Sequence, residues 1–184
     1  MSAKALVPLA DGFEELEAVT IIDVLRRGGV DVVTAHLGES SAVHGAHGLT
    51  MKADAPFAAA AEGEYDALVL PGGPGTDALR KCGPLIERIR RQKAEGRLIC
   101  AICAAPLVLV DAEILEQGQH VTCYPTCVMD LDRPCAGVPV VADGNIITGQ
   151  APGSALLFSL VVLKTLMGDS VANKVARAMV TDVL

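Results

Sequence analysis

The sequence has no apolar run of the ~18 to 20 residues that a helix needs to cross a bilayer. Its longest run, Ala155–Leu163, is interrupted by Ser159 and stopped by Lys164, which is typical of a buried helix. An excess of positive charge is also missing, because 15 Lys and Arg stand against 22 Asp and Glu, a formal net charge of −7. This charge opposes phosphate backbones and anionic lipids, so it argues against strong nucleic-acid binding and against a membrane-surface role.

A secretion signal is missing as well. Between Lys4 and Asp11 lies only Ala5–Ala10, which is shorter than a signal peptide's apolar segment of roughly 7 to 15 residues. Without a signal, the six cysteines are interpreted as reduced thiols of a cytoplasmic protein rather than as three disulfides. With 184 residues, 51% of them hydrophobic, we expect one domain over 1–184 whose core needs no disulfide or metal, and no cofactor.

Short β-rich apolar runs alternate with helix-like segments, the pattern of βαβ units whose parallel strands are buried on both faces. The predicted strands are 3–9, 30–35, 66–70, 98–102 and 120–123; the predicted helices are 14–27, 84–94, 154–166 and 170–180. A short hairpin or bulge is expected near 43–51, and a hairpin over 139–148. The apolar face predicted for the first helix consists of Leu16, Val19, Ile22 and Leu25.

Four loops are the places to look for a site, because ligands of open parallel α/β sheets bind outside the carboxyl ends of the strands. These loops are 11–17, 71–75, 102–106 and 149–154. We expect them to line one crevice.

Cys103 follows the strand 98–102 and precedes a helix, an arrangement similar to the elbow that exposes a nucleophile in hydrolases. The small residues Ala104 and Ala105 permit the tight turn. A thiol at a helix N-terminus is favoured as thiolate, so Cys103 is expected to react fastest of the six cysteines. The alternative is a small buried hydrophobic residue.

Gly72 and Gly73 follow a predicted strand and could bring backbone N–H groups close to an anion or a developing oxyanion. They could equally form an ordinary turn. Glu17, in the first turn of its helix, is either a functional carboxylate or a residue that complements the helix dipole and faces solvent. The residues alone leave these alternatives open.

Cys100 and Cys103 form a Cys-x-x-Cys pair, which suggests a redox dithiol or half of a zinc site with Cys123 and Cys127. Both readings are disfavoured, because Cys100 lies inside the predicted strand and three extended residues separate the two thiols by roughly 10 Å. The four cysteines other than this pair are interpreted as structural or incidental thiols.

Four motifs carry a family resemblance: Ala-Asp-Gly-Phe-Glu-Glu-Leu-Glu-Ala at 10–18, Val-Leu-Pro-Gly-Gly at 69–73, Ala-Ile-Cys-Ala-Ala-Pro at 101–106 and Ala-Pro-Gly-Ser at 151–154. From about residue 3 to about residue 182 the chain resembles the ThiJ/PfpI superfamily, in the branch of the Parkinsonism-associated protein deglycase and its bacterial relatives. The resemblance implies a flavodoxin-like three-layer α/β sandwich with a mostly parallel sheet and a nucleophile elbow, usually as a homodimer.

The resemblance also implies chemistry on 2-oxoaldehydes such as methylglyoxal, or removal of their early glycation adducts, with protection against oxidative or carbonyl stress. The residues that it implies are the nucleophile Cys103, its partner Glu17, the oxyanion donors Gly73 and Ala104, and, on the pocket or its rim, Gly72, His47, Pro152 and Gly153. The rival hypothesis is a redox sensor or stress chaperone in which Cys103 is oxidised and no substrate turns over.

A thiolate at Cys103 could attack an aldehyde to form a hemithioacetal, and Glu17 could move protons between the two carbons. A charged carboxylate would raise the pKa of the thiol, so we expect Cys103 and Glu17 to share one proton. The chain departs from its relatives at two positions. Tyr124 stands where some have a histidine thought to assist catalysis, and Ala104 replaces the histidine of the peptidase-like branch. No later His-x-Glu pair suits an amidotransferase.

Overall fold

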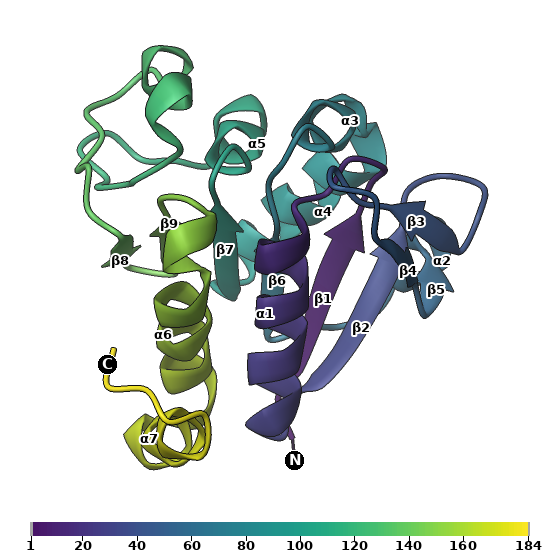
Figure 1. Ribbon diagram of the computed structural model, residues 1–184. Helices are drawn as coiled ribbons and strands as arrows, with labels where there is room; N and C mark the ends of the chain where they lie inside the picture. Colours follow the sequence, from purple (N-terminus) through teal and green to yellow (C-terminus); the bar gives the residue numbers. More distant parts are fainter. Residues whose placement is uncertain (1, 184) are drawn as a thin grey trace.

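A computed structural model describes residues 2–183 and shows a seven-stranded sheet between two layers of helices (Figure 1). The strands are β1 Lys4–Leu9, β2 Asp31–His36, β3 Ala42–His44, β4 Thr50–Lys52, β5 Ala55–Pro56, β6 Ala67–Leu70, β7 Leu98–Ile102, β8 Val140–Asp143 and β9 Ile146–Gly149. The α-helices are α1 Glu15–Arg27, α2 Phe57–Ala60, α3 Thr76–Lys81, α4 Gly83–Ala94, α5 Pro106–Asp111, α6 Ala155–Met167 and α7 Asp169–Ala178. Two 3₁₀ helices, η1 and η2, span Pro125–Asp130 and Pro152–Ser154.

The large sheet has the order β5-β2-β1-β6-β7-β9-β8. All neighbouring strands are parallel except β8 and β9, which form the hairpin expected over 139–148. The hairpin expected near 43–51 is also present, as the separate pair β3 and β4. Among residues 2–183, no helix is both long and apolar enough to cross a membrane.

Alternate residues of the central strands feed two hydrophobic cores, as a strand buried on both faces requires. In β1, Ala5, Val7 and Leu9 pack with α1, α6 and α7 on one face. Leu6 points the other way, into the core covered by α2, α3, α4 and α5. The predicted flavodoxin-like three-layer sandwich is therefore confirmed.

The strand predicted over 120–123 is wrong, because this segment forms only a single bridge between Val121 and Cys135. Thr122 directs its backbone N–H to the Thr148 hydroxyl (2.9 Å) and its own hydroxyl to the carbonyl of Val138 (2.8 Å). Hydrogen bonds that involve side-chain hydroxyl groups thus replace the backbone hydrogen bonds that would have extended the strand.

The predicted buried face of α1 is wrong in its first half. Leu16 is 63% exposed and Val19 46% exposed, whereas Ile22 and Leu25 are buried as expected. The helix is rotated so that Glu17 faces inward. The short helices α2 and α3 were not predicted, because one turn of helix shows no apolar period.

Candidate active site

The chain turns sharply at Cys103, directly after β7. Cys103 has a φ of 65°, in the left-handed region that residues other than glycine rarely occupy. Its N–H donates to the carbonyl of Gly149 (2.9 Å), and Ala105 N–H donates back to the carbonyl of Ile102 (3.0 Å). The strained backbone places the thiol at the carboxyl edge of the sheet, which is the geometry expected of a nucleophile elbow.

Glu17 lies directly behind this thiol. Its side chain is fully buried, and its Oε2 accepts a hydrogen bond from the N–H of Gly72 (2.7 Å). The other oxygen, Oε1, has no N–H or O–H partner among residues 2–183, and the carboxyl group contacts the Cys103 thiol. Glu17 therefore does not face solvent as a simple complement to the helix dipole.

Burial shifts both titrations of this pair upward. It raises the pKa of Glu17 to about 7, against the opposing effect of the Gly72 N–H. Burial, followed by the Glu17 carboxylate, also raises the pKa of Cys103, while the N–H groups of Gly73 and Ala104 act on the sulfur in the opposite direction. The helix N-terminus was expected to lower the pKa of Cys103, but burial and Glu17 raise it by more. A thiolate can therefore form at neutral pH only while Glu17 holds the proton.

Only glycine fits at positions 72 and 73, because a side chain at either one would collide with neighbouring atoms. A Cβ at Gly72 would lie 2.8 Å from the Cβ of Cys103. Gly73 has a φ of 90°, and a Cβ there would lie 2.6 Å from the N of Glu14. A side chain at Gly72 would therefore collide with the nucleophile, and one at Gly73 with the backbone that leads into α1.

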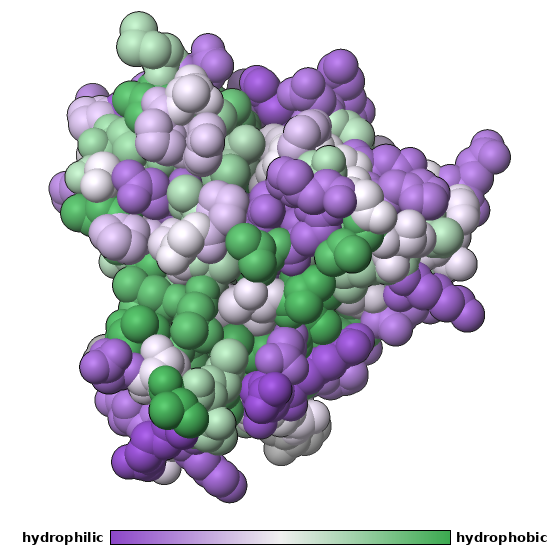
Figure 2. Space-filling view, viewed as in Figure 1, coloured by the Kyte–Doolittle hydropathy of each residue, from purple (hydrophilic) through white to green (hydrophobic). Residues whose placement is uncertain are grey.

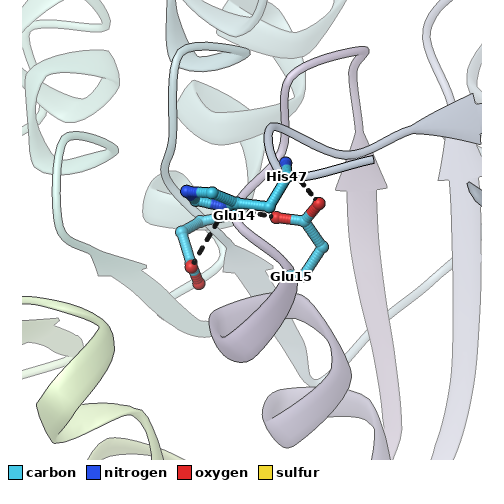
Figure 3. A group of neighbouring side chains, drawn as sticks. All are labelled: Glu14, Glu15 and His47. Carbon is cyan, nitrogen blue, oxygen red and sulfur yellow. Dashed lines mark hydrogen bonds and ion pairs between the residues drawn. The ribbon is translucent and has the colours of Figure 1, made fainter. Parts of the chain in front are cut away.

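His47 lies on the pocket rim, where Figure 3 shows it beside Glu14 and Glu15. Its Nδ1 is 2.9 Å from Oε2 of Glu15 and 4.0 Å from Oε1 of Glu14. Although burial opposes ionisation, hydrogen bonds from His47 lower the pKa of Glu15 to about 2, and the same contact raises the pKa of His47. The three residues could in principle offer ligand atoms to a metal ion, because these atoms lie within 4.8 Å of one another. A metal ion is not needed to balance the buried charge of Glu15, since the ion pair with His47 already does so.

Cys103 opens into a cavity of about 760 Å³. The predicted residues that line it are Gly73, Cys103, Ala104, His47, Tyr124 and Pro152. Glu17 and Gly72 lie behind its wall, in contact with Cys103 or with each other. Gly153 is exposed, does not line the cavity, and has open space where a side chain would start.

One wall of the cavity was missed by the sequence analysis. Thr76 and Arg80 of α3 line this wall. The Arg80 guanidinium donates two hydrogen bonds to the Asp111 carboxylate (2.6 and 3.1 Å), which hold it in place. The η1 segment contributes Cys127 and Asp130. The spacing of four between Thr76 and Arg80 fits one helix face, but the signal depends on recognising a helix of six residues.

Glu17→Gln is expected to raise the free energy of unfolding at pH 8 but not at pH 5. An acid whose pKa is raised by folding contributes its stability below the ordinary value of about 4.5 and loses it as the pH rises through the folded value, here about 7. The rise from 4.5 to about 7, at about 1.4 kcal/mol per pKa unit, predicts a gain of roughly 3 kcal/mol at pH 8, measured by urea unfolding. An equal gain at both pH values would mean that ionisation of Glu17 carries no penalty.

Comparisons with known proteins identify the family of this chain. The model of the DJ-1/PfpI family matches residues 3–165. Protein DJ-1 homolog B of Arabidopsis thaliana is 38% identical over 96% of this chain, which spans only 41% of that protein. The Glutathione-independent glyoxalase DJR-1.2 of Caenorhabditis elegans is 33% identical over 96% of this chain and 94% of its own length. The crystal structure of Drosophila melanogaster DJ-1beta superposes with a TM-score of 0.94 at 36% identity, covering 99% of this chain and 100% of that one. The chain belongs to the DJ-1/PfpI family.

Proposed function

We propose that this protein is a cysteine-dependent enzyme that converts 2-oxoaldehydes such as methylglyoxal, or their early adducts, without glutathione. The observation that carries the proposal is the contact between the Cys103 thiol and a buried Glu17 carboxyl group with a pKa near 7. Similarity to the glutathione-independent glyoxalase of Caenorhabditis elegans supports it. The reaction uses no cofactor, and six free thiols fit a reducing compartment such as the cytoplasm.

The first step joins enzyme and substrate. The Cys103 thiolate attacks the aldehyde carbon, and the carbonyl electrons move to its oxygen, which takes the proton held by Glu17. The N–H groups of Gly73 and Ala104 already act on the sulfur, so they lie beside the new oxygen as it becomes negative. The product is a neutral hemithioacetal beside an ionised Glu17.

The second step moves hydrogen between the two substrate carbons. Ionised Glu17 removes the proton from the carbon bonded to sulfur, and the electron pair moves to the neighbouring carbonyl oxygen. The hemithioacetal hydroxyl passes its proton to that oxygen, which gives an enediolate with its charge on the oxygen of the carbon bonded to sulfur. Glu17 returns the proton to the neighbouring carbon, which leaves a thioester of lactate on Cys103. Water cleaves this thioester, so methylglyoxal plus water gives lactate and the free thiol returns.

Wild-type protein should form lactate from methylglyoxal with glutathione omitted. Cys103→Ser should abolish turnover, and Glu17→Ala should reduce kcat at least 100-fold, since general acid–base assistance is typically worth about 10²- to 10⁴-fold. An enzymatic lactate assay measures both. Gly153→Ala is the matched control, because that position is exposed and open, and it should retain full activity.

Absence of lactate from the wild-type protein would overturn the proposal. Oxidation of Cys103 without turnover would then favour the rival hypothesis of a redox sensor. Full activity in Glu17→Ala would overturn the role of Glu17 alone.

Tyr124 should limit the rate. It lines the cavity, and its N–H donates to the carbonyl of Cys103 (2.8 Å). A phenol is a poor proton acceptor at neutral pH, whereas an imidazole accepts and donates. Tyr124→His should therefore raise kcat for methylglyoxal at least about 10-fold with a smaller change in KM. Steady-state kinetics over pH 6 to 8 test this, and an unchanged or lower kcat would show that Tyr124 does not limit proton transfer.

We further propose that two copies of the chain associate through the outer face of α1. Leu16 and Val19 are exposed there, and Leu49 of the β3–β4 turn is 58% exposed. Apolar side chains also gather over the α1 and α6 side of the molecule in Figure 2. Large exposed apolar surfaces of this kind mark association sites.

Sedimentation equilibrium should give twice the chain mass of 19.0 kDa. Leu16→Asp should shift the protein to monomer, because it places a charge in the apolar contact. Met129→Asp should not, although Met129 is 90% exposed, since it lies in η1 away from α1. A monomeric wild type, or a dimer that tolerates Leu16→Asp, would contradict this surface.

A further inference from the structure

Three cysteines gather beside the cavity, in the segment that follows α5. Cys123, Cys127 and Cys135 pack with Leu107 and Leu131 in a small hydrophobic cluster separate from the two main cores. None of the three belongs to the catalytic pair. The single bridge between Val121 and Cys135 brings the start and the end of this segment together.

Cys123 and Cys135 are direct neighbours within the cluster. Their thiols interact with each other, and the Cys135 sulfur is also 4.0 Å from the Thr122 hydroxyl. Cys123 is fully buried, whereas Cys135 is partly exposed. A solvent oxidant can therefore reach Cys135, and the second thiol is already in place behind it.

The two thiols differ in acidity. Burial, with the neighbouring Cys135 adding to it, raises the pKa of Cys123 to about 12. Burial also opposes ionisation of Cys135, but N–H groups of Gly137 and Cys123 and the neighbouring hydroxyl and thiol lower its pKa below the ordinary value. Thiolate is the form that attacks peroxide, so Cys135 is the nucleophile of the pair.

We propose that Cys123 and Cys135 form a reversible disulfide in response to peroxide, with Cys135 as the attacking thiol. The Cys135 thiolate attacks one peroxide oxygen; the S–O bond forms, the O–O bond breaks, and the leaving hydroxide is protonated to water. Cys123 then loses its proton and attacks the sulfenic sulfur, so that an S–S bond forms and the S–O bond breaks with release of a second water. Two thiols and one hydrogen peroxide give one disulfide and two waters.

This disulfide would form next to the wall of the cavity. Tyr124 follows Cys123 directly and lines the cavity. Its N–H donates a hydrogen bond to the carbonyl of Cys103. The N–H of Cys127 in turn donates to the carbonyl of Tyr124 (2.8 Å). Oxidation would thus cross-link the two ends of the segment that carries Tyr124 and η1.

The test uses the full chain with Cys103→Ser, so that the result does not depend on the proposed activity. The protein is treated with hydrogen peroxide, its remaining thiols are blocked with iodoacetamide, and it is cleaved before aspartate without reduction. Cleavage at Asp111, Asp130, Asp132 and Asp143 separates Cys123 and Cys127, on peptide 111–129, from Cys135, on peptide 132–142. We expect these two peptides to be joined, lighter by two hydrogen atoms than their sum, and released by dithiothreitol.

Two further variants identify the partner thiol. Adding Cys127→Ser should leave the cross-link in place, with only the mass change of that substitution and of its lost alkylation, whereas adding Cys123→Ser should abolish the cross-link and let a sulfenic acid accumulate at Cys135, which dimedone traps. Cys82→Ser is a control that should behave like the parent. Absence of the cross-link in the parent, its persistence without Cys123, or trapping at Cys123 instead of Cys135 would overturn the proposal.

Discussion

A carboxyl group enclosed by the protein determines how the pocket of this protein is built. Glu17 is fully buried, and among residues 2–183 the one N–H that donates to its carboxyl group belongs to Gly72. Because ionisation is costly there, burial raises the pKa of this carboxyl group to about 7, and the group lies in contact with the Cys103 thiol. The rotation of α1, the absence of side chains at Gly72 and Gly73, and the left-handed turn at Cys103 all serve to bring these two groups into contact.

The sequence was sufficient for the elements whose patterns are long or strongly marked. The strand before Cys103 was predicted with its observed bounds, and the helix after Gly83 within one residue. Residues brought together by motif, such as Cys103, Glu17 and Gly73, also meet in the structure as expected. The bounds of these elements are local features, because each depends on neighbours within a few positions of the chain, whereas the meeting of the three residues was implied by the family resemblance.

The failures have a common physical origin in contacts between distant segments. Leu16 and Val19 look like core residues by spacing, yet the burial of Glu15 and Glu17 turns them outward. The segment after His120 has the composition of a strand, but the Thr148 hydroxyl takes the N–H that a ladder would use. Arg80 was not predicted as a cavity residue, because its side chain is positioned by Asp111 of α5, which is distant in the sequence.

The order of residues along the first turns of α1 has a thermodynamic consequence. Leu16 and Glu17 are consecutive, so one peptide unit joins an exposed apolar side chain to the proton-holding group of the pocket. A displacement of the backbone on the outer side of this turn would also displace the carboxyl group on its inner side. If two copies associate through α1 as proposed and this turn moves on association, association and proton uptake by Glu17 would be linked equilibria, each changing the other by the same coupling free energy.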